Sequence, residues 1–472
     1  MKYLIPLLIV FFILVSCKSS ENLGESLGSE KPNIILIISD DAGYADFGFT
    51  GSQEMHTPNL DRLAKNGWNY KQAYVTASVC CPSRMGLMTG RYQQRFGAEC
   101  NVPTIPTPGF SKQDLGLDVG EKTMGDLLKE QGYKTFLVGK WHLGLAPKYH
   151  PLDRGFDEFY GFLGGSRSYW PLENPARPKK IYRNRELVDE KKEIQYLTDD
   201  LTEESIAFIE KNPNNPFFIY LSYNAVHTPM HAKVEDIEQQ SIRGSKKRKI
   251  YAAMTQNMDK NIGKLLHQLK SKNLFENTLI AFINDNGGAG NNASKNTPLR
   301  GTKGSYWEGG IRIPFILHWP KKIEAKEFQY PISTLDLIPT FLKAAGAQAF
   351  PDNLDGRDLF TPANESKSAI ERPYLFWRLW RAAAVRKGDW KLIRVADDPL
   401  QKERKLLAPL VLVNLKEDPG ESKNLADTHP EIRDELLLAL ESWEEGLAKP
   451  RWYDGQDWEH WADMQLKGHS MN

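Results

Sequence analysis

The chain has 472 residues, with 61 lysines and arginines against 60 aspartates and glutamates, so its formal net charge is +1. This balance argues against bulk electrostatic capture of nucleic acid, and a hydrophobic share of 40% excludes global disorder. Four cysteines are too few to hold a chain of this length together by disulfides. The composition therefore predicts a globular protein with a sizeable core and no nucleic-acid partner.

The first segment has the pattern of an export signal. Lys2 precedes an apolar run over 3–15, which is shorter than the roughly 18–20 residues that a membrane-spanning helix needs. The Leu-Val-Ser-Cys sequence at 14–17 resembles a bacterial lipobox, which implies that Cys17 is lipidated and becomes the mature N-terminus. We therefore expect a lipoprotein signal peptide over 1–17 and a linker over 18–31. The mature protein would be exported to the periplasm, outer membrane or cell surface and held at the membrane only by its N-terminal lipid.

Between residues 32 and 346, apolar runs alternate with helical patterns. Runs rich in β-branched residues predict strands at 33–38, 134–139, 216–223, 278–284 and 313–319. Helices are predicted at 57–66, 123–131, 198–211, 247–272 and 334–345. This alternation predicts an α/β catalytic domain with a large, mainly parallel or mixed sheet between helices. Ligands should gather at the carboxyl ends of its strands.

The pattern changes after residue 346. Four short strands are predicted at 374–378, 382–386, 390–395 and 410–414, with a turn at 387–389, and an amphipathic helix at 431–447. These elements predict a smaller α+β subdomain over 347–472 that carries an antiparallel sheet. Its aromatic tail, which contains Trp452, is expected to pack on the body of the protein.

The most specific motif is Ser-Val-Cys-Cys-Pro-Ser-Arg-Met-Gly-Leu-Met-Thr-Gly at 78–90. Pro82 suits the first position of a helix and Gly90 its end, so Cys80 is expected just before a helix N-terminus. Unpaired N–H groups at such a terminus stabilise negative charge, which would favour a reactive thiolate, and Arg84 could pair with an oxyanion. On residue type alone, a buried structural cysteine is the common alternative.

Acidic and amide side chains follow two of the predicted strands. Asp40 and Asp41 come after the first strand, and Asp285 and Asn286 come after the strand at 278–284. Taken alone, such residues often only cap a turn or a helix. Two neighbouring strand ends would instead bring three carboxylates and one amide oxygen together. This set suits Ca²⁺ or Mg²⁺ and has no soft ligand that would favour zinc.

Basic residues lie in three further loops. Lys140 and His142 belong to Gly-Lys-Trp-His-Leu-Gly at 139–144, His227 follows the strand at 216–223, and Lys303 lies in a glycine-rich segment at 298–314. A lysine and histidine two residues apart are ordinarily a solvated pair on a loop. The glycine-rich segment could suggest a phosphate-binding loop, but the Walker spacing is absent.

Together these motifs resemble the formylglycine-dependent sulfatases, which are type I enzymes of the alkaline-phosphatase superfamily. Residues 80–90 match the family signature Cys-x-Pro-Ser-Arg-x-x-x-Leu/Met-Thr-Gly, whose first cysteine is oxidised to formylglycine by a maturation enzyme. The resemblance covers residues from about 31 to 425 and implies an alkaline-phosphatase-like fold. It also implies a Ca²⁺ or Mg²⁺ site and a catalytic set. The metal ligands would be Asp40, Asp41, modified Cys80, Asp285 and Asn286, and the catalytic residues Cys80, Arg84, Lys140, His142, His227 and Lys303.

The resemblance also implies a mechanism. One hydroxyl of the hydrated aldehyde at position 80 would attack sulfur, and the other would then expel sulfate. His142 is the candidate base for the second step, since an ordinary histidine pKa of about 6.5 suits proton transfer near neutrality. His227 and Lys303 would bind sulfate and assist departure of the alcohol, and the sequence leaves open which of them is the main acid.

The expected substrate is a sulfated oligosaccharide or polysaccharide. Export suggests degradation of algal glycans such as ulvan, carrageenan or fucoidan ahead of glycosaminoglycans. Two alternatives are a phosphomonoester or phosphonate hydrolase of the same superfamily and a non-catalytic glycan-binding lipoprotein. The complete signature and the lack of a second His/Asp metal set argue against the first. The loop with Arg167, Tyr169 and Trp170 could shape a sugar pocket or simply pack, and pairing of Cys81 with Cys100 is left open.

Overall fold

The structure, a computed structural model, describes residues 31–102, 105–107, 109–361, 374–396 and 405–453. Contacts divide the chain into a unit over 1–30 and a unit over 31–472, and all described residues belong to the second unit. The expected signal peptide and Cys17 lie outside the described residues, so export and lipidation stay predictions. Within the described ranges, no helix is both long and apolar enough to cross a membrane.

An eleven-stranded mixed sheet runs through the described catalytic region in the order β10-β2-β11-β9-β1-β8-β4-β5-β6-β7, with β12 also paired to β2. Its central strands are parallel, since β1 pairs with β8 and β9, and β4 pairs with β8 and β5. All seven residues of β1 are buried, as its unbroken apolar run predicts. The strands are β1 (Asn33–Ser39), β2 (Trp68–Tyr74), β4 (Lys134–Lys140), β5 (Glu158–Phe162), β6 (Tyr182–Arg183), β7 (Glu186–Leu187), β8 (Phe217–Ser222), β9 (Thr278–Asn284), β10 (Arg312–Ile313), β11 (Phe315–His318) and β12 (Lys326–Ser333).

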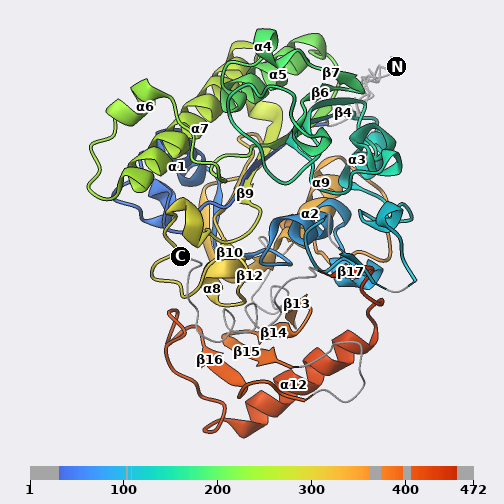
Figure 1. Cartoon of the computed structure of the whole chain (residues 1–472), viewed down its shortest axis with the longest axis vertical. Coiled ribbons are helices and arrows are strands. Elements are labelled where there is room, and N and C mark those ends of the chain that lie inside the picture. The colour runs from blue at the N-terminus through green and yellow to red at the C-terminus, as the bar shows by residue number, and fades with distance from the viewer. Residues whose placement is uncertain (1–30, 103–104, 108, 362–373, 397–404, 454–472) are drawn as a thin grey trace, which may run out of the picture. The chain divides into compact units, whose positions relative to one another are not determined.

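Helices cover both faces of this sheet, and alternate residues of β1 show which helices lie on which face. Ile35 and Ile37 pack in one apolar cluster with α1 (Pro58–Lys65), α5 (Leu197–Lys211) and α7 (Lys246–Ser271). Leu36 and Ile38 pack in another with α2 (Cys80–Thr89), α3 (Met124–Glu130) and α9 (Leu337–Ala344). Figure 1 shows α5 and α7 side by side. Shorter helices are α4 (Glu190–Glu193), α6 (Val234–Glu238) and α8 (Glu308–Ile311).

A second sheet is antiparallel and has the order β13-β14-β15-β16. It comprises β13 (Leu375–Leu379), β14 (Ala382–Lys387), β15 (Trp390–Val395) and β16 (Val411–Asn414), and α12 (Pro430–Glu445) packs on it (Figure 1). Trp452 is fully buried in β17 (Trp452–Tyr453), which pairs with β3 (Ile105–Pro106). The α/β sheet and the smaller antiparallel sheet are both as predicted. The domain boundary at residue 346 stays a prediction.

The structure adds strands that the sequence pattern does not reveal. β2 contains Asn69, Lys71 and Gln72, and these polar residues conceal a strand that pairs with β10, β11 and β12. The predicted strand at 313–319 is divided at Pro314, which lacks the N–H that a continuous strand requires. Its second part, β11, runs antiparallel to β9. The sheet is therefore mixed at the edge that contains β2.

A buried ion network joins the second sheet to the catalytic region. Lys391 of β15 places Nζ 2.9 Å from Glu308 Oε1 and 2.6 Å from Glu421 Oε1, and all three side chains are fully buried. Tyr74 donates a 2.6 Å hydrogen bond to the other oxygen of Glu308. Because Glu308 begins α8 within the glycine-rich segment, this network fixes one end of the loop that carries Lys303.

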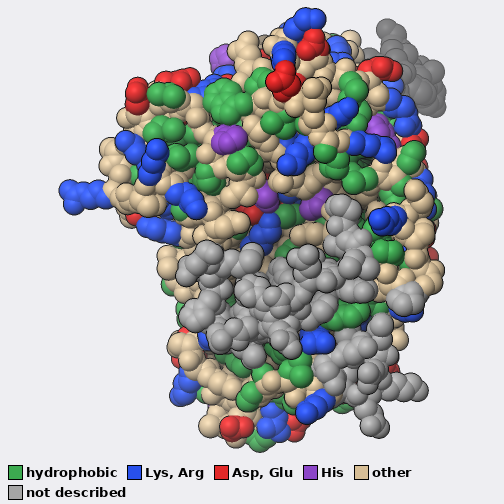
Figure 2. Space-filling view, in the orientation of Figure 1, with side chains coloured by type: hydrophobic (Ala, Val, Ile, Leu, Met, Phe, Trp, Pro, Cys, Tyr) green, Lys and Arg blue, Asp and Glu red, His purple; other side chains and the backbone are tan. Residues whose placement is uncertain are grey.

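Charged side chains of both signs lie on the face that Figure 2 shows, and several lysine and arginine side chains gather at its left edge. The formal net charge of the whole chain is +1. Recognition of an anionic substrate therefore draws on local arrangements of charge.

Candidate active site

The predicted site residues come together at the carboxyl ends of four neighbouring parallel strands. Asp40 and Asp41 follow β1, Lys140 ends β4, and Asp285 follows β9, while the loop after β8 carries His227. Two more segments complete the site: the start of α2, with Cys80 and Arg84, and the loop before α8, with Lys303. This is the edge at which parallel sheets bind ligands.

Cys80 is the first residue of α2, two residues earlier than Pro82 suggested, and Val79 is the N-cap. Gly90 ends the helix with φ 67°, a left-handed conformation that glycine adopts without strain. The Cys80 side chain is buried, and its Sγ lies 3.9 Å from Asp40 Oδ1 and 3.9 Å from Asp41 Oδ1. The helix N-terminus therefore aims position 80 at the two carboxylates.

Three cationic side chains surround these groups. Lys303 Nζ lies 3.0 Å from Cys80 Sγ and 2.7 Å from Asp41 Oδ1. Lys140 Nζ lies 2.7 Å from Asp40 Oδ2, and His227 Nε2 lies 3.4 Å from Asp41 Oδ2. An anion at position 80 would therefore meet positive charge on several sides.

Arg84 is fully buried and connects α2 to the ends of two strands. Its Nε donates to Asp285 Oδ2 at 2.9 Å, and its Nη1 donates to Ser222 Oγ at 2.6 Å. The Asp41 amide in turn donates to Asp285 Oδ1 at 3.2 Å. Ser222 of β8 and Asp285, which follows β9, thus hold the Arg84 guanidinium in one orientation.

The electrostatics favour negative charge at position 80. Burial raises the pKa of the Cys80 thiol, but Lys140 and Lys303 outweigh burial and bring this pKa below its usual value. Burial lowers the pKa of His227, but Asp41 and Asp40 raise it to about 9, so the ring is cationic at neutral pH. Burial likewise raises the pKa of Asp41, and Lys303 and His227 hold it below its usual range.

The donor set fits a hard cation. Ligand atoms of Asp40, Asp41, Cys80 and His227 all lie within 4.8 Å of one another. Asn286 is fully buried, and its Oδ1 has no hydrogen-bond partner in the described structure, while its Nδ2 donates to Asp41 Oδ1 at 2.8 Å. Burial and the nearby charge of Asp285 raise the pKa of Asp40, a crowding of carboxylates that a bound cation would relieve.

His142 lies at the edge of this cluster. It is buried, its Nε2 is 3.2 Å from Val102 O, and its Nδ1 has no partner among the described residues. Burial and the charges of Lys140 and Arg84 place the pKa of His142 well below the ordinary 6.5 that the sequence argument assumed. The ring is therefore neutral at neutral pH, with one nitrogen free to accept a proton.

Some residues of the site carry no motif in the sequence. Ser222 holds Arg84, and Asn292 donates from Nδ2 to the backbone oxygens of Asp41, at 3.0 Å, and Val226, at 3.1 Å. Tyr169 donates from its hydroxyl to Asn224 O at 2.5 Å and lies 2.9 Å from His227 O. A single serine, asparagine or tyrosine gives no signal of such a role until the fold is known.

The loop with Arg167, Tyr169 and Trp170 could have shaped a sugar pocket, but the first two of these side chains pack inside the protein. Arg167 is buried and forms an ion pair with Glu190 at 2.8 Å, and Tyr169 is buried beneath the His227 loop. Trp170 is 38% exposed. Cys81 and Cys100 are both buried, and neither forms a disulfide within the described residues.

Comparison with known proteins places this geometry in a family. The model described as Sulfatase matches residues 32–347, and a model described as N-sulphoglucosamine sulphohydrolase, C-terminal, matches residues 302–445. N-acetylgalactosamine-6-sulfatase of Canis lupus familiaris is 33% identical over 393 residues, which cover 79% of this chain and 73% of the relative. Steryl-sulfatase of Homo sapiens is 32% identical over 449 residues, which cover 78% of this chain and 74% of the relative.

Solved structures agree with this placement. The crystal structure of Ps i-CgsB in complex with k-i-k-neocarrahexaose is similar at a TM-score of 0.81 and 37% identity, over 93% of this chain and 99% of that one. The phosphonate monoester hydrolase SpPMH from Silicibacter pomeroyi shares the fold alone, with 16% identity and a TM-score of 0.64 over 89% of this chain and 96% of that one. The chain therefore belongs to the sulfatase family, type I enzymes of the alkaline-phosphatase superfamily, and is a sulfuric ester hydrolase.

Proposed function

We propose that this sulfatase removes sulfate from a sulfated carbohydrate, with formylglycine derived from Cys80 as nucleophile and Ca²⁺ as the bound metal. The observation that carries the proposal is the position of Cys80 at the start of α2, within 3.9 Å of two carboxylates and 3.0 Å of the Lys303 ammonium. Calcium is favoured because carboxylate and amide oxygens supply most of the donors. The ligands would be Asp40, Asp41, the modified side chain at position 80, Asp285 and Asn286.

The chemistry divides between these groups and the side chains around them. When present, the hydrated aldehyde supplies a hydroxyl that attacks sulfur and a carbon that can later release sulfate, and the metal supplies positive charge for the sulfate oxygens. Lys140 and Arg84 add fixed positive charge at the carboxylates that line the site, where water is excluded and charge acts strongly. They orient the sulfate and stabilise its developing charge.

Two residues can hold the proton that the departing alcohol needs. His227 is cationic at neutral pH, and Lys303 keeps its proton because Asp41 and Cys80 raise its pKa well above the usual value despite burial. Both contact Asp41, so both face the same side of the site. His142, neutral and with a free Nδ1, accepts the proton when sulfate is released.

The substrate class follows by analogy with relatives. Ps i-CgsB was solved with a neocarrahexaose bound, and that structure is 37% identical to this chain. We propose an algal polysaccharide as substrate, with carrageenan and ulvan oligosaccharides first in a panel that also contains fucoidan and glycosaminoglycan fragments. We further propose that the protein is exported and lipidated at Cys17. Replacing Cys17 with alanine would then release it from the membrane fraction, and retention there would contradict the anchor.

The decisive experiment combines mass and activity. Protein made with a maturation enzyme is digested, the Cys80 peptide is weighed, and sulfate release is measured on the panel and on matched phosphate esters. Formylglycine in the active fraction and turnover of sulfate esters over phosphate esters are expected. Full activity with an unmodified thiol would refute the nucleophile, and faster phosphate release would refute the substrate class. Unchanged turnover after verified removal of metal would refute the metal role.

A further inference from the structure

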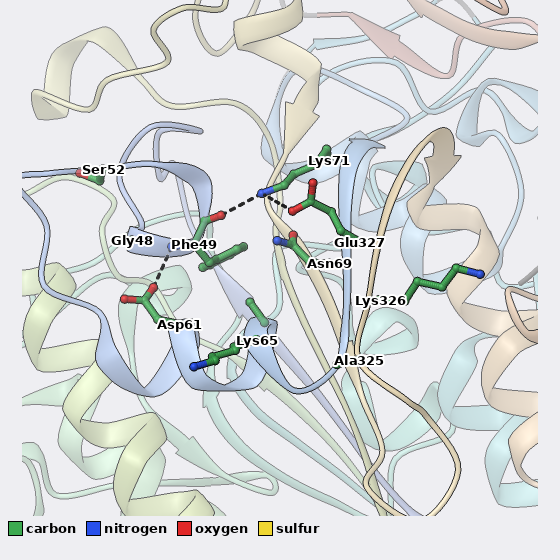
Figure 3. Close-up of a pocket in the computed structure, with 11 residues that line it drawn as sticks. Gly48, Phe49, Ser52, Asp61, Lys65, Asn69, Lys71, Ala325, Lys326 and Glu327 are labelled. Atoms are coloured by element: carbon green, nitrogen blue, oxygen red, sulfur yellow. Dashed lines mark hydrogen bonds and ion pairs between the residues drawn. The ribbon is translucent and has the colours of Figure 1, made fainter.

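Two cavities lie beside α1, and none of the active-site residues lines either of them. The first is lined by residues of η1 (Gly48–Thr50), α1, β2 and β12. Figure 3 shows that Lys71 in this cavity points toward Glu327 and the backbone of Phe49, at 3.2 and 3.1 Å. Asp61 accepts a hydrogen bond from the Phe49 amide at 2.8 Å. The polar groups of this cavity thus largely satisfy one another.

The second cavity differs in this respect. It has a volume of about 500 Å³ and lies between α1, α7 and the end of β11. Arg62, His267 and Lys270 line it, and no aspartate or glutamate does. These three side chains are exposed, and the Lys270 ammonium lies over the Phe275 ring, 4.6 Å from its centre. An excess of positive charge on this scale favours an anionic group.

A buried histidine also lines this cavity. His318 is 4% exposed, and its Nδ1 has no hydrogen-bond partner among the described residues. Its ring lies 5.4 Å from the ring of Phe275, which also lines the cavity. Burial and the charge of Lys270 lower the pKa of His318 to about 4, so the ring is neutral and able to donate one hydrogen bond.

The rest of the lining is apolar or uncharged. Leu63, Leu266 and Ile323 are buried in the wall of the cavity, and Asn59 and Asn66 lie at its border. Apolar side chains and an aromatic ring suit the C–H face of a sugar, whereas a free inorganic anion would gain nothing from them. The combination therefore fits a sugar ring that carries an anionic group.

The cavity is separate from the active site. His318 pairs with Ile280 near the start of β9, and the candidate metal ligand Asp285 follows the other end of that strand. Five residues of extended strand span about 17 Å. The cavity and the active site thus lie at opposite ends of a buried strand, so only an extended, polymeric substrate could occupy both.

We propose that this cavity, lined by Arg62, Lys270, Phe275 and His318, is a second binding site for a sulfated sugar unit of the polymeric substrate. Arg62 and Lys270 bind the sulfate, and Lys270 leaves the face of the Phe275 ring, on which the sugar then packs beside His318. Holding one unit of the chain here raises the local concentration of other units at the active site. The identity of the ligand as a sulfated carbohydrate rests on the proposed function, whereas the location of the site does not.

The test uses the full chain with Cys80→Ala, so that ligand binds without turnover. Neocarrahexaose is titrated into protein with isotope-labelled histidine, and ring signals are followed by NMR. His318→Gln and His267→Gln variants assign the two cavity signals, and His142 and His227 report on the active site. Saturable shifts of the His318 and His267 signals are expected, with a desulfated hexaose giving none.

A matched pair of double variants tests the charges. R62A/K270A removes the two cavity cations, and K264A/K272A removes two cations of α7 and its C-cap that pair with Glu203 and Glu210 outside the cavity. The first should weaken cavity binding about tenfold or more. In the active enzyme it should raise KM for the polymer several-fold, while kcat and the KM for a small aryl sulfate stay unchanged. The second pair should alter neither.

The outcomes separate the two proposals. Shifts of His318 without shifts at His142 or His227 would support the cavity and count against the active-site substrate. Shifts confined to the active-site histidines would overturn the cavity proposal and leave the proposed function standing. The cavity proposal is also overturned if R62A/K270A binds as K264A/K272A does, or if the desulfated hexaose binds equally well.

Discussion

The buried contacts of Lys391 predict a large loss of stability when its charge is removed. Its ammonium is the shared partner of Glu308, at 2.9 Å, and Glu421, at 2.6 Å, and none of the three side chains is exposed. In the Lys391→Met variant, Glu421 and Glu308 would remain buried without this counter-charge, and Glu308 would keep Arg312, whose Nη1 lies 3.5 Å from its Oε2. Removing one partner of a buried ion pair costs about 3–5 kcal/mol of unfolding free energy. Because Lys391 serves two carboxylates, we expect a loss in the upper half of that range.

A neighbouring lysine supplies the control. Lys387 lies on the adjacent strand and pairs with Glu435, but these side chains are 49% and 45% exposed. Lys387→Met should therefore cost no more than about 1 kcal/mol. Both variants and the parent are unfolded in urea and followed by tryptophan fluorescence, and the midpoints and slopes give the free energies.

A double variant tests the cause of the loss. Lys391→Met combined with Glu421→Gln removes one of the two stranded carboxylates, so it should be more stable than Lys391→Met alone. Equal losses for Lys391→Met and Lys387→Met would refute the argument that burial sets the cost. A double variant no more stable than the single one would refute the assignment of the loss to unpaired carboxylates.

Three further predictions concern the active site and the core. His227→Gln and Lys303→Met should each lower kcat on an alkyl sulfate by about 10²–10⁴. The alcohol of 4-nitrophenyl sulfate departs without a proton, so the variant that lacks the main acid should lose much less activity on that ester. Equal losses on both esters would exclude an acid role for the replaced residue. Chelation should lower both activity and the melting temperature, with Ca²⁺ restoring both, because a metal that binds only the folded state stabilises it; an unchanged melting temperature would contradict a metal held by buried carboxylates. The pKa of His318 in the folded protein is about 4, below the usual 6.5. The contribution of the neutral ring to the unfolding free energy is therefore complete above pH 6.5 and is lost as the pH falls toward 4. That loss amounts to about 3 kcal/mol. Urea titrations at several pH values should show it for the parent but not for His318→Gln. If the unfolding free energies of the two proteins change in parallel with pH, the lowered pKa of His318 is refuted.

Local sequence was sufficient for the elements with strong patterns and for most of the candidate site. The apolar run at the start of the catalytic region is β1, buried throughout, because a strand covered on both faces has no polar side to present. Asp40, Cys80, Lys140 and His227 could be predicted as candidates because each lies in a short motif next to a recognisable element. β2 was missed because its polar residues interrupt the apolar pattern by which a buried strand is recognised.

Tertiary structure alone decided how these residues meet and in which ionisation state. Lys303 contacts Asp41 across 262 residues of sequence and Arg84 contacts Asp285 across 201, and no local pattern encodes such pairs. The lateral order of the strands brings them together, and burial with neighbouring charge then lowers the pKa of His142 and raises that of His227. The sequence thus determined which chemical groups this protein has. The fold determined their distances and their dielectric surroundings, on which proton affinity and charge stabilisation depend.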